Sequence, residues 1–267
     1  MNSPANPCQT SPLMDPASQS FLQRTMVLIP AYNEEASLPA LLAEVHRELP
    51  EAAVTVIDDG SADQTSRVAR EGGARLLRLP CNMGVGPAVQ TGFVYALECG
   101  FEHVIRLDAD GQHPPAEARK LVATMLTAPA DLVVGTRYGA GSLYHGSWSR
   151  QIVLKGLALF VSLICRQRIT DPTSGFWLLS RPLLQCFALH YPSDYPEAEA
   201  IALLRRQGFS MAEVPVVFRP RVAGQSSIHA WNSFIFAAKV FLALFVDRLR
   251  AVDPRGSAEF IKKAGAT

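Results

Sequence analysis

Residues 25–35, TMVLIPAYNEE, decide the fold class because an almost wholly apolar run ends abruptly in a polar segment. The run TMVLIP at 25–30 is typical of a buried strand, since strands of a sheet covered on both faces are apolar throughout. After the polar segment, apolar residues recur at the spacing of a helix: Leu38, Leu41, Leu42, Val45 and Leu49. The sequence therefore predicts a strand, a polar loop and an amphipathic helix in succession.

The same alternation continues through the first half of the chain. Further strands are predicted at 53–57, 74–79, 103–107 and 131–135, and helices at 63–71, 87–99 and 115–127. Strands that alternate with helices indicate an α/β fold, with a mainly parallel sheet flanked by helices. Because ligands of such sheets bind at the carboxyl ends of the strands, the candidate functional loops begin at Pro30, Asp58 and Asp108.

The composition excludes several classes of protein. With 48% hydrophobic and 18% charged residues, the 267-residue chain is globular rather than disordered. Five scattered cysteines without a CxxC pair argue against a disulfide scaffold or a structural zinc site, and they favour a reducing compartment. A net charge of +1 is too balanced for a general nucleic-acid binder.

The charges are unevenly distributed along the chain. Residues 24–136 carry 9 Lys/Arg against 15 Asp/Glu, whereas residues 137–250 carry 13 against 6. An acidic half followed by a basic half suggests that the first part holds a cation and the second holds anions.

The loop at 108–113, DADGQH, carries the residues best suited to hold a metal. Two carboxylates two residues apart, next to a glycine and an amide, can bind one hard divalent cation through oxygen. A solvated loop with a helix-capping aspartate is the alternative. At 58–61, DDGS fits either an Asx-type turn or hydrogen bonds to a base or ribose. The segment NMGVG at 82–86 falls short of a dinucleotide motif, because Val89 replaces the third glycine.

Four segments together resemble the family-2 glycosyltransferases, which have the GT-A fold: VLIPAYNEE (27–35), VIDDGS (56–61), NMGVGPAVQTG (82–92) and LDADGQHPP (107–115). Within that family the chain is most similar to the polyprenol-phosphate (dolichol-phosphate) mannosyl- and glucosyltransferases. Segments of the second half fit that branch in order: GTRY (135–138), DPTSGFWLLSR (171–181), YPEAEA (195–200) and RVAGQSS (221–227). The resemblance covers about residues 27–230 and implies a Rossmann-like GT-A domain.

The resemblance implies a role for each matching residue. The nucleotide pocket would be lined by Pro30, Tyr32, Asn33, Glu34, Asp58 and Asp108. Mg²⁺ or Mn²⁺ on the diphosphate would be held by Asp108, Asp110 and Gln112. The acceptor phosphate or the donor diphosphate would be bound by Arg137, Arg150, Arg221 and Ser226. The residues expected to be catalytic are Asp110, Arg137 and Arg221.

The implied reaction is inverting transfer of a sugar from a GDP- or UDP-sugar to polyprenyl phosphate, in the synthesis of a cell-envelope glycan or glycolipid. A lipid phosphate is already anionic at neutral pH, so this reaction requires no general base. A relative that uses a sugar or small-molecule hydroxyl would require one, and Glu197 and Glu199 are the candidates. A third hypothesis is an inactive scaffold that binds a nucleotide sugar at a membrane.

The chain is expected to comprise a disordered leader at 1–23, the catalytic domain at 24–230, an amphipathic interfacial helix at 231–250 and a tail at 251–267. Residues 1–20 lack the basic and apolar segments of a signal peptide. The apolar stretches 152–165 and 234–246 would form helices of only about 20 Å, short of a hydrocarbon core of about 30 Å. They fit buried helices or helices in a membrane interface. We therefore expect a cytoplasmic protein in peripheral contact with the inner face of the cytoplasmic membrane.

Overall fold

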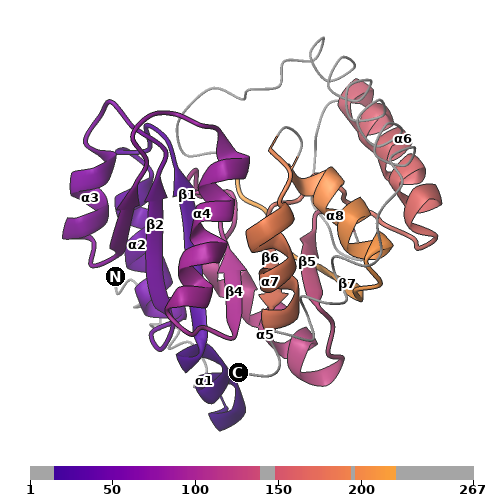
Figure 1. Ribbon diagram of the computed structural model, residues 1–267, viewed down its shortest axis with the longest axis horizontal. Helices are drawn as coiled ribbons and strands as arrows, with labels where there is room; N and C mark the ends of the chain where they lie inside the picture. The colour runs from indigo at the N-terminus through magenta and orange to yellow at the C-terminus, as the bar shows by residue number, and fades with distance from the viewer. Residues whose placement is uncertain (1–14, 139–147, 194–195, 221–267) are drawn as a thin grey trace, which may run out of the picture.

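The computed structural model describes residues 15–138, 148–193 and 196–220, the first three residues of the second range as backbone alone. Figure 1 shows a twisted sheet with helices on both faces. The strands are β1 (Thr25–Ala31), β2 (Ala53–Asp58), β3 (Arg75–Arg78), β4 (His103–Arg106), β5 (Leu132–Thr136), β6 (Trp177–Ser180) and β7 (Met211–Pro215). The helices are α1 (Pro16–Gln23), α2 (Leu38–Glu48), α3 (Thr65–Glu71), α4 (Val85–Glu98), α5 (Ala118–Thr127), α6 (Trp148–Cys165), α7 (Arg181–His190) and α8 (Pro196–Arg206), with a 3₁₀ turn η1 (Pro115–Glu117).

The sheet has seven strands in the order β3-β2-β1-β4-β6-β5-β7. All neighbouring pairs are parallel except those of β6, which runs antiparallel to β4 and to β5. The predicted mainly parallel sheet is therefore confirmed. The antiparallel strand β6 and the helix α7 that follows it were not predicted from the sequence.

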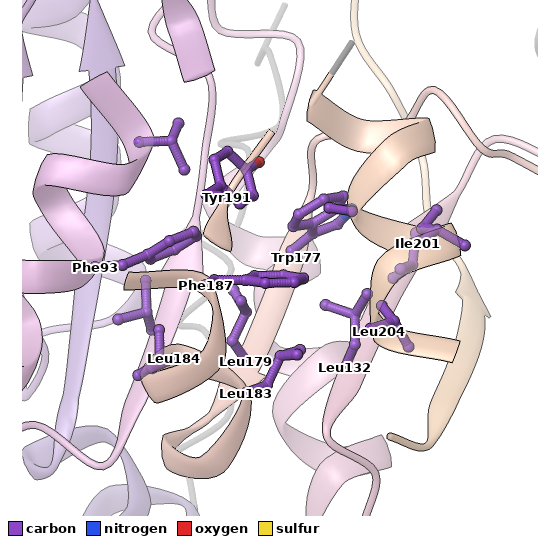
Figure 2. Packing of buried hydrophobic residues seen from close by; sticks show 14 of the residues in the cluster. Phe93, Leu132, Trp177, Leu179, Leu183, Leu184, Phe187, Tyr191, Ile201 and Leu204 are labelled. Atoms are coloured by element: carbon purple, nitrogen blue, oxygen red, sulfur yellow. The ribbon is translucent and has the colours of Figure 1, made fainter. Parts of the chain in front are cut away.

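Alternate side chains of β1 enter two different cores, because successive residues of a strand point to opposite faces. Met26 and Leu28 pack with α4, α7 and α8, whereas Val27 and Ile29 pack with α1, α2 and α5. Figure 2 shows the first of these cores, where aromatic rings of α4, β6 and α7 meet. Burial on both faces explains why β1 is apolar along its whole length.

The expected leader is wrong for residues 16–23, which form helix α1. The carboxylate of Asp15 accepts a hydrogen bond from the amide of Ser18 and caps the helix. Phe21 and Leu22 are buried, and the ring of Phe21 stacks on His103 at a centroid distance of 4.0 Å. The Pro- and Ser-rich composition of the segment led to the expectation of disorder, whereas the buried Phe21 and Leu22 pack this segment against the sheet. The rest of the expected leader, 1–14, lies outside the described residues.

The order of the strands places the candidate loops at one edge. The chain runs outward from β1 to β2 and β3 and then returns to the other side of β1 at β4. Ligands of open α/β sheets bind at such a reversal, beyond the carboxyl ends of the strands. The loops after β1, β2 and β4 all leave this edge. Because β6 is antiparallel, the segment 171–176 that precedes it reaches the same edge.

Helix α6 contains the predicted apolar stretch 152–165 and lies beside α8, at the periphery of the molecule (Figure 1). One face of the helix is buried, including Leu157 and Val161. In the part of the chain that the structure describes, no helix is both long and apolar enough to cross a membrane. The second stretch, 234–246, and the expected helix at 231–250 lie outside the described residues.

Candidate active site

The loops after β1 and β2 are tied together by reciprocal hydrogen bonds. The amide of Asn33 donates to Oγ of Ser61 at 2.9 Å, and the amide of Ala62 donates to Oδ1 of Asn33 at 2.9 Å. Asn33 has a φ of 56°, a left-handed conformation that asparagine tolerates better than most residues. The amide of Glu34 donates to Oγ1 of Thr65 at 2.8 Å. Together these bonds fix the backbone of the predicted nucleotide-binding segment.

The side chains in this segment differ in how they are placed. Pro30 is buried within β1, whereas Tyr32 and Asn33 are exposed at the edge of the sheet. The carboxylate of Glu34 accepts a hydrogen bond from the hydroxyl of Ser37, at the start of α2. Of the predicted residues in this segment, Tyr32 and Asn33 therefore have the side chains most accessible to a ligand.

The carboxylates of the DDGS loop hold the loop itself. Asp58 is fully buried and accepts hydrogen bonds from the amide of Ser61 at 2.8 Å and from the hydroxyl of Ser66. Asp59 accepts the amides of Met83 and Gly84, both at 2.8 Å, and so anchors the start of α4. The contact with a nucleotide predicted for Asp58 would have to compete with these internal bonds.

The loop after β2 requires a glycine at position 60, directly after the two aspartates. The φ of Gly60 is +71°, and a Cβ at this position would lie 2.5 Å from the carbonyl carbon of Cys81. A side chain would therefore separate the loop after β2 from the loop after β3. The close approach of these two backbones builds the β2–β3 side of the candidate site.

The predicted metal loop follows β4. The side chain of Asp108 is 36% exposed, whereas Asp110 is buried and its Oδ1 accepts the amide of Gln112 at 3.0 Å. Behind the loop, the amide of Asp108 donates to Nδ1 of His113 at 3.0 Å. The pKa of His113 is lowered to about 4, chiefly by burial, with the charges of Arg106 and Arg137 contributing and the charge of Asp108 opposing. A neutral His113, stacked on a phenylalanine ring, therefore supports the backbone of the loop.

This loop fits one kind of metal site. Within the described residues, no group of three or more His, Cys, Asp or Glu side chains could hold a metal ion without other ligands. Mg²⁺ is usually bound by one or two carboxylates together with substrate phosphates and water. An accessible Asp108 beside Asp110 matches that pattern, in which a diphosphate completes the coordination.

Arg106 lies directly beneath the metal loop, and its side chain is only 1% exposed. One guanidinium nitrogen, Nη2, is 2.7 Å from Oε1 of Glu197 and 3.4 Å from Oδ1 of Asp108. The other, Nη1, donates to the hydroxyl of Tyr191 at 3.2 Å. Burial alone would lower the pKa of Arg106, but the nearby Tyr191, Glu197 and Asp108 more than offset this and raise it. A fixed positive charge therefore lies against the metal loop.

Arg137, the residue that follows β5, pairs with Asp171. Its Nε is 2.7 Å from Oδ2 of Asp171, and its Nη2 is 2.9 Å from Oδ1. Nη2 also donates to Oγ1 of Thr173 at 2.9 Å. Glu213 on β7 accepts the amides of Thr170 and Asp171, which fixes the loop from the other side. Burial raises the pKa of Glu213, although these hydrogen bonds oppose the rise.

The remaining predicted anion-binding residues fall on segments without a described side chain. The side chain of Arg150, together with Arg221 and Ser226, lies outside the described residues. The last described segment, 216–220, runs beside the metal loop, because the amide of Arg219 donates to the carbonyl of Gln112 at 3.0 Å. The guanidinium of Arg219 pairs with Glu44 on α2 at 2.7 Å. The chain therefore leaves the described region next to Gln112.

The two candidate general bases lie in the first turn of α8. Glu197 is paired with Arg106, as described above, and Glu199 is partly buried on the same helix. Sequence reasoning did not single out Arg106, Asp171, Tyr191 or Glu213. For Arg106 a signal was present, because a charged residue interrupts the apolar strand HVIRL. For Asp171 the signal was its place in the DPTSGF segment, to which no role had been assigned.

Comparison with known proteins places the chain among glycosyltransferases. Residues 26–187 match the family described as Glycosyl transferase family 2. The polyprenol monophosphomannose synthase of Mycolicibacterium smegmatis is 32% identical over 228 residues, which cover 82% of this chain and 86% of that protein. The undecaprenyl-phosphate mannosyltransferase of Micrococcus luteus is 29% identical over 214 residues, which cover 77% of this chain and 87% of that protein.

Solved structures show the same architecture. The glucosyl-3-phosphoglycerate synthase of Mycobacterium tuberculosis, in complex with Mn²⁺, uridine diphosphate and glucosyl-3-phosphoglycerate, has a TM-score of 0.66 to this chain. The two chains are 21% identical, and the match covers 94% of this chain and 88% of the other. The seven-stranded sheet with its flanking helices is therefore a GT-A fold. Since the family match spans more than half of the sequence, this chain belongs to glycosyl transferase family 2.

Proposed function

We propose that this glycosyltransferase moves a sugar from a nucleoside diphosphate donor to polyprenyl phosphate, and that Asp108 and Asp110 hold a divalent cation on the diphosphate. The observation that carries the proposal is the accessible Asp108 beside the buried Asp110, at the edge where the strand order reverses. The names of the two bacterial relatives, which describe transfer to polyprenyl phosphates, support the acceptor. The solved relative with Mn²⁺ and uridine diphosphate supports the metal.

The chain's own residues would divide the work between donor and acceptor. Tyr32 and Asn33 present accessible side chains to the nucleotide, while the hydrogen-bonded loops after β1 and β2 hold their backbone in place. A bound Mg²⁺ or Mn²⁺ would neutralise charge that builds on the leaving diphosphate. Arg221 and Ser226 follow the segment that ends beside Gln112, so we propose that they bind the acceptor phosphate or the diphosphate.

The exposed face of α6 supports contact with a membrane. Ile152, Leu159 and Leu163 are 51%, 64% and 69% exposed, and their spacing places them on one side of the helix. The exposed Lys155 falls on the same side, and the exposed Arg166 directly follows the last residue of the helix. An apolar stripe with basic neighbours suits the surface of an anionic leaflet, where the acceptor lipid would be found. We therefore propose a peripheral location on the inner face of the cytoplasmic membrane.

Transfer of labelled sugar into an organic phase tests the reaction. Purified protein is incubated with a panel of GDP- and UDP-sugars, Mn²⁺ or Mg²⁺, and a polyprenyl phosphate. Label should enter the organic phase with one nucleotide sugar, and chelation with EDTA should abolish transfer. Label that moves instead to a soluble sugar hydroxyl would favour the alternative acceptor, with Glu197 or Glu199 as general base. Donor binding without turnover on any acceptor would favour the scaffold hypothesis.

A further inference from the structure

We infer that Glu197 is a positioning residue for the metal loop, because its negative charge balances the buried guanidinium of Arg106 and so limits the pull of that guanidinium on Asp108. The inference rests on the proposed metal site and deepens it. It assigns to Glu197 a role that differs from the general base considered for a hydroxyl acceptor.

The surroundings of Arg106 show that its charge cannot be relieved by water. The guanidinium carbon lies 5.5 Å from the ring centre of Trp177, and Nη1 contacts the hydroxyl of Tyr191. A Cβ on Gly175 would lie 3.0 Å from Nη2 of Arg106 and 3.2 Å from Oδ2 of Asp108. The glycine thus lets the backbone of the 171–176 loop close over the pair. A charge enclosed in this way requires a partner of opposite sign.

Two carboxylates share the same nitrogen of Arg106, and they do so unequally. Glu197 lies at 2.7 Å from Nη2, whereas Asp108 lies at 3.4 Å, beyond the usual length of a charge-assisted hydrogen bond. Glu197 is therefore the stronger partner, although it comes from a helix 91 residues further along the chain. The weaker contact still orients the Asp108 carboxylate without committing it to the arginine.

The pairing of Glu197 with Arg106 should affect cation binding through the local charge. With Glu197 in place, the four charged side chains Arg106, Asp108, Asp110 and Glu197 carry a summed formal charge of −2. Without Glu197 the charge falls to −1, and the guanidinium would draw Asp108 toward itself and repel the cation. Glu197 therefore increases the affinity of the metal loop for a divalent cation.

A double-mutant cycle on metal affinity tests the inference. Binding of Mn²⁺ is measured by calorimetry or electron paramagnetic resonance, in the presence of GDP or UDP, whichever the wild type binds. Glu197→Gln should raise the Kd for Mn²⁺ about tenfold or more, as expected for one unbalanced charge beside the loop. Arg106→Met should bind Mn²⁺ at least as tightly as the wild type. The double variant should return to within about threefold of the wild type, since both buried charges are gone.

Glu71→Gln serves as the matched control, because it removes one carboxylate from an exposed pair on α3, and its Kd should equal that of the wild type. Thermal unfolding without metal gives a second readout, in which Glu197→Gln should be destabilised and the double variant should recover. A wild-type Kd in Glu197→Gln, or a double variant as weak as Glu197→Gln, would overturn the inference. Lost turnover at unchanged metal affinity would show Glu197 to be a base instead. A wild type that binds no Mn²⁺ would remove the proposed metal site itself.

Discussion

The guanidinium of Arg137 forks onto the carboxylate of Asp171, and the backbone amide of Arg137 donates to the same Oδ2 at 3.1 Å. The arginine side chain is 13% exposed and the aspartate only 1%. This pair joins the end of β5 to the loop that precedes β6, and it positions the loop that closes over Arg106 and Asp108. A phosphate-binding role for Arg137, which the resemblance to the family implies, would therefore require the arginine to share its guanidinium with Asp171.

Asp171→Asn should cost about 3 kcal/mol in the free energy of unfolding, because it breaks a largely buried ion pair by removing the charge of one partner. Chemical denaturation measures the loss. Breaking the exposed pair of Arg67 with Glu71 by Glu71→Gln should cost less than about 1 kcal/mol. Equal, small losses in the two variants would show that the Arg137 pair contributes little to the fold.

Asp110→Asn should abolish turnover while the protein stays folded. The Oδ1 atom of Asp110 accepts the amide of Gln112, and the oxygen of an asparagine can accept the same bond. The substitution therefore keeps the shape of the loop and removes only the charge that attracts the cation. Activity and the affinity for Mn²⁺ should fall together, and the unfolding temperature should remain close to that of the wild type. Near wild-type activity that is insensitive to EDTA would contradict the metal assignment.

Arg221→Ala should lower kcat/KM about 100-fold, since a guanidinium that forks onto a phosphate makes two charge-assisted bonds worth a few kcal/mol. Arg221→Lys should recover little of this loss, because an ammonium cannot reproduce the planar fork. Steady-state kinetics on both variants measure the effect, with the exposed Arg70→Lys as a control for charge-conserving change. A lysine variant indistinguishable from the wild type would mean that a single point charge is sufficient.

Local sequence patterns predicted the first half of the sheet closely, because strands such as β1 and β2 are largely apolar runs followed by polar residues. The predicted 25–30 corresponds to β1, Thr25–Ala31, and 103–107 to β4, His103–Arg106. Strand β6 escaped prediction because it has only four residues, WLLS, and lies between β4 and β5 through long-range antiparallel pairing. No local periodicity encodes such an insertion.

In the candidate site, too, the sequence predicted the loops but not the residues that support them. The loops that begin at Pro30, Asp58 and Asp108 were expected at one edge, and the strand order confirms that arrangement. The residues behind the loops were not foreseen, because their roles depend on partners far along the chain. Arg106 meets Glu197 across 91 residues, and Arg137 meets Asp171 across 34. The contacts of these side chains can be recognised only in the folded structure, where residues distant in the sequence lie next to each other.

The free energy of unfolding should decrease as the pH is lowered, and part of that decrease should come from His103. The pKa of His103 is lowered to about 4, chiefly by burial, with the charge of Glu102 opposing this and the charge of Arg24 contributing to it. The unfolded chain binds a proton at His103 near pH 6.5, whereas the folded chain does so only near pH 4. The contribution of His103 to the free energy of unfolding is therefore fully retained above about pH 6.5 and is lost as the pH falls from about 6.5 to about 4. The loss attributable to His103 should be on the order of 2 kcal/mol, less than the full shift implies because the ring is only partly buried.

His103→Phe tests this dependence, since it keeps a ring against Phe21 and removes the titrating group. The difference in unfolding free energy between the variant and the wild type should shift in favour of the variant as the pH falls through this window. Denaturant titrations at several pH values measure that difference. Parallel curves for the two proteins would show that His103 titrates alike in the folded and unfolded chains.

Vesicle binding should depend on the exposed face of α6 and on the segment 231–267. Replacement of Ile152, Leu159 and Leu163 by serine should weaken binding to anionic liposomes, because it removes the apolar contact with the bilayer. Co-sedimentation measures the bound fraction. High salt should weaken binding of the intact chain without abolishing it, since only the basic contribution is screened.

Truncation after residue 230 separates the membrane role of the C-terminal segment from a role in folding. If residues 231–250 form the expected interfacial helix, the truncated protein should leave the liposomes and retain nucleotide and metal binding. Serine at the buried Leu157 provides the contrasting variant on α6, because it should lower the unfolding temperature through loss of packing. A truncated protein that unfolds would place 231–250 in the core. An intact protein that does not bind anionic vesicles would argue against a lipid acceptor, because the long apolar chain of a polyprenyl phosphate partitions into the bilayer.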